Sequence, residues 1–294
     1  MTEVSIATQI KTSIVPFSCF EDIKRDIAEF AQREDLNKFQ KWIAKERYVL
    51  EPKLDFEPKS ILAAALPFQI YHAVFSYNGN RYVSVVDHVV STDEVKAHLS
   101  AGNDCRFFFD YWLPQKRIAV RCGLADYGKN NICFVEDMGS LVTLFCFISD
   151  MPCPDNYTWR EVQTMSACED CSLCRKNCPT GAIQEDRFLL DNKRCLTALN
   201  DWTGKRFPKF VPKLAHHRVI GCSRCQDICP KNIGKYNNVA KIIEFDQAET
   251  KLLLSGKKLE KLPAGLQEKL EECDIKWCYN SLPRNLRAWF ENGS

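Results

Sequence analysis

The spacing of the cysteines constrains this chain more than any other feature. Residues 168–179 read C-x2-C-x2-C-x3-C-P, and a second group at residues 222–230 reads C-x2-C-x3-C-P. In the first pattern three thiolates surround one [4Fe–4S] cluster, while the cysteine before the proline ligates the other cluster of a two-cluster protein. The second group lacks one early member of that pattern, and Cys195 supplies it from a distance. The spacing therefore predicts two [4Fe–4S] clusters.

The two groups are expected to exchange the cysteine that precedes each proline. The first predicted ligand set is Cys168, Cys171, Cys174 and Cys229, and the second is Cys178, Cys195, Cys222 and Cys225. Structural zinc is the alternative, because four-cysteine zinc sites also use C-x2-C spacing. Eight cysteines with two C-x3-C-P endings fit zinc poorly, so the pattern favours clusters.

The cysteine content also bears on the compartment. The chain has 16 cysteines in 294 residues, a content that would indicate disulfides in a small secreted domain. This chain is long, and its N-terminus lacks a basic stretch followed by a long apolar core, so we expect no secretory signal. Reduced thiolates that bind metal in the cytoplasm are therefore expected. Eight cysteines lie outside both sets, and those in apolar strands, such as Cys146, are expected to pack in the core.

Composition excludes several classes of protein. The hydrophobic fraction of 45% excludes a disordered chain, and no apolar run approaches the ~20 residues that span a bilayer. Lys and Arg number 40 against 38 Asp and Glu, a net charge of +2, so contact with nucleic acid requires a local patch. Residues 205–218 form one basic segment that contains Phe207 and Phe210. It is either a phosphate-binding patch with stacking aromatics or a solvated loop over the clusters, and we slightly favour the loop.

Three zones follow from the sequence pattern: an α/β domain at residues 1–160, the cysteine-rich domain at 161–240 and a helical tail at 241–294. Residues 23–30 and 39–43 have helical spacing, as one broken helix or two. Residues 60–68 and 81–90 predict strands, residues 92–99 predict a capped helix, and residues 132–137 and 141–149 predict a hairpin or two core strands. The tail, with breaks at Gly256, Pro263 and Pro283, predicts two or three short amphipathic helices.

These motifs together resemble the epoxyqueuosine reductases, which are cobalamin-dependent iron–sulfur enzymes related to reductive dehalogenases. The resemblance rests on CEDCSLCRKNCPTGAI, DNKRCLTAL and RVIGCSRCQDICPKN in the cysteine-rich zone. In the first zone it rests on KSILAAALPF and RCGLADYGKNNICFVEDMGSLVTLFCFISDMP. The match covers roughly residues 50–235, and it resembles a short member without the C-terminal helical-repeat domain of the longer ones.

The resemblance implies a nitroreductase-like α/β domain that binds base-off cobalamin, followed by a ferredoxin-like domain with two clusters. It implies cofactor contacts at Lys129, Asn130, Gly139 and Ser140. The segment from Gly123 to Asn130 is nearly a phosphate-binding loop, but Asn130 replaces its Ser or Thr, so we expect a glycine turn facing the cofactor.

The resemblance also implies an activity, the reduction of epoxyqueuosine to queuosine in tRNA, with an aspartate as proton donor. Asp110 is the candidate donor, placed by a one-residue gap upstream of Arg121. The substrate is tRNA or a smaller molecule, and electrons come from an external donor such as a flavodoxin or ferredoxin. A monomer is expected. The alternative function is an electron-transfer or corrinoid-reducing protein without substrate chemistry of its own.

Overall fold

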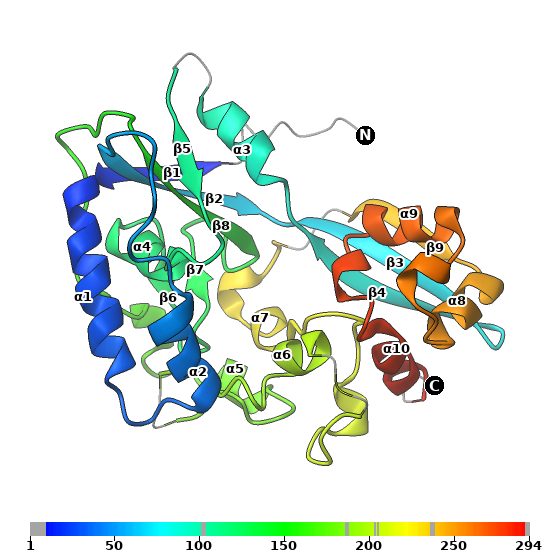
Figure 1. Cartoon of the computed structure of the whole chain (residues 1–294). Coiled ribbons are helices and arrows are strands. Elements are labelled where there is room, and N and C mark those ends of the chain that lie inside the picture. Colours follow the sequence, from blue (N-terminus) through cyan, green and yellow to red (C-terminus); the bar gives the residue numbers. More distant parts are fainter. Residues whose placement is uncertain are drawn as a thin grey trace. The chain divides into compact units, whose positions relative to one another are not determined.

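The computed structural model describes residues 10–100, 104–185, 188–202, 204, 206–235 and 239–291 (Figure 1). They divide into two compact units, whose bounds differ from the three predicted zones. The first unit takes the chain up to residue 67 together with residues 90–128 and 132–169. The second takes residues 68–89, 129–131 and the chain from residue 170 onward. Residues 68–89, expected in the first zone, thus group with the C-terminal part of the chain.

The first unit is built on a four-stranded antiparallel sheet in the order β1–β2–β8–β5. The predicted strand at residues 60–68 is confirmed as β2. This strand lies between β1 and β8, and apolar side chains pack on both of its faces, which explains its continuous apolar run. The four strands are β1 (Lys11–Pro16), β2 (Ser60–Pro67), β5 (Phe107–Phe109) and β8 (Val142–Ser149).

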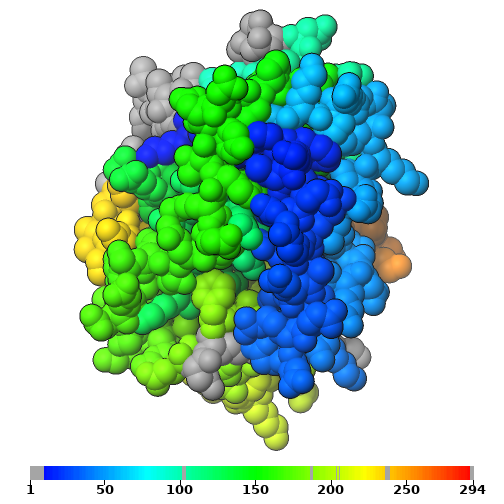
Figure 2. Space-filling view, turned by 90° about the vertical axis from the view of Figure 1, so that its left-hand side faces the viewer, coloured from blue at the N-terminus to red at the C-terminus, as the bar shows by residue number. Residues whose placement is uncertain are grey.

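Helices cover both faces of this sheet. Ile23 of α1 and Ile118 of α4 pack with Ile61 and Ile148 on one face, and Val95 of α3 packs on the other. The bounds are α1 (Phe20–Ala31), α2 (Lys38–Trp42), α3 (Thr92–Leu99) and α4 (Gln115–Arg121), with a π-helix at Ile43–Arg47 directly after α2. The predicted helices at residues 23–30 and 39–43 are therefore two. In Figure 2 the blue N-terminal residues of this unit lie beside its green later residues.

The hairpin predicted between residues 132–137 and 141–149 is not formed, and the alternative of two separate strands is correct. The short strand β7 (Cys133–Phe134) pairs with β6 (Asp126–Tyr127), whereas β8 pairs with β2 and β5. The chain between them turns at residues 135–139, where the Gly139 N–H donates to the Val135 carbonyl at 2.9 Å. Asp137 and Gly139 have φ values of 62° and 74°, which suit the turn.

The second unit has a three-stranded sheet in the order β4–β3–β9. The strands β3 (Gln69–Tyr77) and β4 (Asn80–His88) form a hairpin through Asn78 and Gly79, both with positive φ, as a two-residue turn requires. Strand β9 (Val239–Phe245) runs parallel to β3. Its partner lies far away in the sequence, so local pattern did not predict it.

Three helices of the tail pack on this sheet through Phe75, Phe245, Leu253 and Leu270 (Figure 1). They are α8 (Gln247–Leu254), α9 (Ala264–Glu272) and α10 (Leu282–Phe290), as the pattern predicted. Pro283 does not break the tail as expected, because it lies in the first turn of α10, where proline removes no helical hydrogen bond. No helix in the described part of the chain has both the length and the hydrophobicity of a membrane span.

Candidate iron–sulfur and cofactor site

The two cysteine groups have the same local structure in the second unit. Cys171 and Cys222 are each followed by a serine and then by a one-turn helix, α5 (Leu173–Lys176) or α7 (Arg224–Asp227). The two helices pack on each other, and the Asn177 amide donates to the Arg224 carbonyl at 2.6 Å. The C-x2-C spacing thus wraps each pair of thiols around the start of one short helix.

The second predicted ligand set is brought together within this unit. Burial raises the pKa of the Cys195, Cys222 and Cys225 thiols, that of Cys222 to about 11. Neighbouring thiols of the same set, Cys178 among them, raise these pKa values further. Desolvated thiols that repel one another as anions ionise together only when cations bind them, so the donor set fits an iron–sulfur cluster.

The first predicted set is divided between the two units. Cys168 ends a short helix, Ser166–Cys168, in the first unit, whereas Cys171, Cys174 and Cys229 belong to the second. Within the second unit, Cys174 raises the pKa of Cys225, so a thiol of one set lies near a thiol of the other. All eight predicted ligands have intermediate exposure.

Among the described residues, no three or more His, Cys, Asp or Glu side chains are grouped as ligands of a single metal ion. A [4Fe–4S] cluster differs in that each thiolate binds its own iron atom, so its ligands lie further apart than those of one ion.

The four predicted cofactor-binding residues lie in two turns. Lys129 is exposed, and its Nζ donates to the carbonyl of Cys171 at 3.5 Å, next to a predicted cluster ligand. Asn130, Gly139 and Ser140 are buried, with Asn130 3% and Ser140 2% exposed. Lys129 thus offers an exposed cation, a group that can bind the polar amides of a cofactor, whereas Asn130, Gly139 and Ser140 are enclosed by protein.

Asp110 follows β5 directly and is half-buried. Its Oδ1 accepts the N–H of Trp112 at 2.7 Å, and its backbone carbonyl accepts the N–H of Leu113 at 3.1 Å. Leu113 is 2% exposed and packs in the core of the first unit, so the turn has one fixed end. This arrangement holds the Asp110 carboxyl in one orientation at the end of a strand.

The two aromatic side chains of the basic segment contact arginine side chains of the second unit. The Arg284 guanidinium lies 4.2 Å from the ring centroid of Phe207, and that of Arg194 lies 4.8 Å from Phe210. Lys205, the first basic residue of the segment, lies outside the described residues. Phe210 remains 41% exposed, so the choice between a phosphate-binding patch and a solvated loop stays open.

Residues 167–232 match a protein family described as the 4Fe-4S double cluster binding domain. The chain is 28% identical over 178 residues to epoxyqueuosine reductase of Bacillus anthracis, a match that covers 60% of this chain and 43% of the relative. The chain thus spans less than half the length of this curated relative.

The fold is similar to that of solved epoxyqueuosine reductases. The structure from Bacillus subtilis, in which an aspartate-bearing catalytic loop is swung out of the active site, matches with a TM-score of 0.60. It is 21% identical in sequence, and the match covers 95% of this chain and 76% of that one. An epoxyqueuosine reductase bound to an epoxyqueuosine-modified tRNA stem loop matches with the same TM-score and identity. The chain thus holds a double [4Fe–4S] cluster domain in a protein similar in sequence and fold to the epoxyqueuosine reductases.

Proposed function

We propose that this chain is an iron–sulfur, cobalamin-dependent reductase that converts epoxyqueuosine in tRNA to queuosine. The observation that carries the proposal is the pair of four-cysteine ligand sets within the region that matches the double cluster domain. Two adjacent clusters move single electrons, and the remaining chain is far larger than a cluster carrier needs. The chemistry on that larger part is therefore the substrate reaction, and an external donor such as a flavodoxin or ferredoxin supplies the electrons.

Cobalamin, when bound, supplies a strongly nucleophilic reduced metal centre. Lys129 would bind it through its charge, and Asn130, Gly139 and Ser140 are the further contacts that the family resemblance implies. The two four-cysteine sets would hold the clusters, which supply electrons one at a time.

Asp110 is the proposed proton donor. Opening and removing the epoxide oxygen consumes two electrons and two protons, and an acid placed at that oxygen makes it a better leaving group. The Asp110 carboxyl is held by one hydrogen bond at Oδ1, from the Trp112 N–H. That bond orients the group, and Oδ2 is the oxygen that we assign to face the substrate.

The decisive experiment is anaerobic reconstitution with iron, sulfide and cobalamin, followed by metal analysis, EPR and turnover of an epoxyqueuosine-modified tRNA stem loop. The proposal expects about eight irons and one cobalt per chain, a base-off cobalamin EPR signal, and formation of queuosine. Eight irons without retained cobalt would leave an electron-transfer protein instead. Retained cobalt with no turnover of the stem loop would instead indicate a different, smaller substrate.

The variant Asp110→Asn tests proton donation separately from cluster and cofactor binding. Asparagine keeps the Oδ1 acceptor for Trp112 but cannot donate a carboxyl proton. We expect full iron and cobalt content with turnover lowered by about 10²-fold or more, the usual range for loss of a general acid. Unchanged turnover would remove Asp110 from the role of proton donor.

A further inference from the structure

Arg47 packs against Trp112, which lies two residues after Asp110 in the same loop. The Arg47 guanidinium carbon lies 4.2 Å from the ring centroid of Trp112 and 5.2 Å from that of Trp42. The two indoles meet edge to face, with centroids 6.1 Å apart and an interplanar angle of 78°. A guanidinium in contact with two indoles is attracted by the ring quadrupoles and adds stacking contact.

Trp112 links this cluster to Asp110. Its backbone N–H donates to the Asp110 carboxylate, and its backbone carbonyl accepts the N–H of Val49 at 3.0 Å. Val49 lies two residues after Arg47, so backbone and side chain of the same segment hold the same tryptophan. A displacement of Trp112 would therefore displace the hydrogen bond that orients the Asp110 carboxyl.

The segment that supplies Arg47 has an unusual backbone. Residues Ile43–Arg47 form a π-helix, and the Tyr48 N–H donates to the Ile43 carbonyl, five residues back, at 3.2 Å. Such turns are rare and are frequently found at functional sites. Here the turn ends at Arg47.

We propose that Arg47 is a positioning residue for proton transfer from Asp110, acting through Trp112. The inference rests on the proposed function, since it assumes that Asp110 donates the proton. Arg47 holds Trp112 against the π-helix, Trp112 orients the carboxyl, and release of the arginine lets the loop leave its working position. In this role Arg47 acts only through Trp112.

The test compares Arg47→Ala with Arg33→Ala in the reconstituted protein. Arg33 is another exposed arginine of the same unit, which pairs with Asp35 through two hydrogen bonds of 2.9 Å, so it controls for lost charge. We expect Arg47→Ala to lower kcat about tenfold, a change typical of a misplaced catalytic group, with KM within twofold. Near-UV circular dichroism should change as Trp112 loses its partner, and Arg33→Ala should alter neither quantity.

A double mutant isolates the route through Asp110. In the Asp110→Asn background, Arg47→Ala should lower turnover little further, because coupled residues give non-additive effects. Equal loss in both backgrounds, or a raised KM with unchanged kcat, would overturn the proposal, the latter by showing that Arg47 binds substrate. Trp112→Phe keeps an aromatic face for Arg47 and should retain most activity.

The outcomes distinguish the two proposals. If Asp110→Asn is fully active, the assigned proton donor fails and this inference fails with it. If Asp110→Asn is inactive and Arg47→Ala resembles Arg33→Ala, only the positioning role fails. If the Arg47→Ala variant does not retain its iron, the variant Arg47→Lys is tested in its place. Lysine keeps the charge without the planar stack, so we expect an intermediate kcat, and a wild-type kcat would contradict the inference.

Discussion

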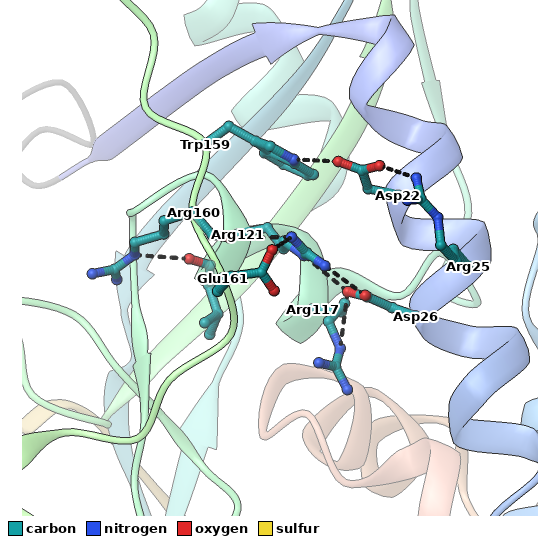
Figure 3. Close-up of polar contacts among 9 residues, drawn as sticks. Asp22, Arg25, Asp26, Arg117, Arg121, Trp159, Arg160 and Glu161 are labelled. Atoms are coloured by element: carbon teal, nitrogen blue, oxygen red, sulfur yellow. Dashed lines mark hydrogen bonds and ion pairs between the residues drawn. The ribbon is translucent and has the colours of Figure 1, made fainter.

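Arg121 of α4 and Asp26 of α1 form a two-bond ion pair inside the first unit (Figure 3). The Nε and Nη2 atoms of Arg121 donate to the two carboxylate oxygens of Asp26 at 2.9 and 2.6 Å. Asp26 raises the pKa of Arg121 above its usual value, and both side chains are about nine-tenths buried. Nη1 of Arg121 also donates to Glu161, in the segment that leads to Cys168. The pair thus joins α1 to α4, and Arg121 also contacts the segment that contains Glu161.

Removal of one partner should be strongly destabilising. Asp26→Ala leaves a buried arginine without its main partner, and we expect the free energy of unfolding to fall by about 3 kcal/mol. The control is Arg25→Ala on the same helix, whose side chain is 66% exposed in its pair with Asp22 and should matter by less than about 1 kcal/mol. Chemical denaturation of the two variants measures the difference, and equal losses would contradict the buried-pair argument.

The second ligand set can be tested at Cys195. This residue caps the N-terminus of α6 (Leu196–Asp201), where serine is a favoured residue, so Cys195→Ser should preserve the helix. We expect iron to fall from about eight to about four atoms per chain, because one cluster loses a ligand. Cys278→Ser is the matched control: its thiol donates to the Ile275 carbonyl, a role that a hydroxyl can keep. Loss of iron in both variants, or in neither, would argue against the assigned set.

Lys129 is expected to contribute to cofactor retention rather than to cluster assembly. Its exposed ammonium group donates to the carbonyl of Cys171. Cluster ligands are cysteine thiolates, so loss of this lysine removes no ligand. Lys129→Ala should therefore keep about eight irons and weaken cobalamin binding about tenfold, equivalent to about 1.4 kcal/mol. Lys251→Ala, an exposed lysine of α8, provides the comparison. The test is the equilibrium affinity of both variants for cobalamin. Equal affinities would show that Lys129 is not part of the cofactor site.

The parts predicted well from the sequence are those set by local chemistry. Apolar runs and caps predicted β2 and α3, and cysteine spacing predicted the double cluster domain that the family match supports. Relationships between distant segments were not predictable, because no local pattern encodes them. The pairing of β9 with β3 is one example, and it groups residues 68–89 with the tail. The contact of Arg47 with Trp112 is another, since neither residue belongs to a recognisable motif.

A final prediction concerns pH and Asp201, the last residue of α6. Burial raises the pKa of its carboxyl to about 6, although the charge of Arg284 acts in the opposite direction. Among the described residues its Oδ1 has no hydrogen-bond partner, and Arg284 instead donates to the carbonyls of Leu199 and Asn200. A carboxylate at a helix C-terminus also faces the negative end of the helix dipole.

The sign of this effect follows from the raised pKa. Well below about pH 4 the Asp201 carboxyl is protonated in both folded and unfolded chains, so its burial carries no charge penalty. As pH rises to about 6 the unfolded chain releases its proton first, and stability falls. Asp201→Asn should therefore stabilise the protein by about 1–2 kcal/mol at pH 7.5 and by much less at pH 4.5. Asp93→Asn, at a side chain 91% exposed, should show no such dependence. Thermal unfolding of both variants at the two pH values tests this, and a pH-independent gain would show that Asp201 does not titrate as its burial implies.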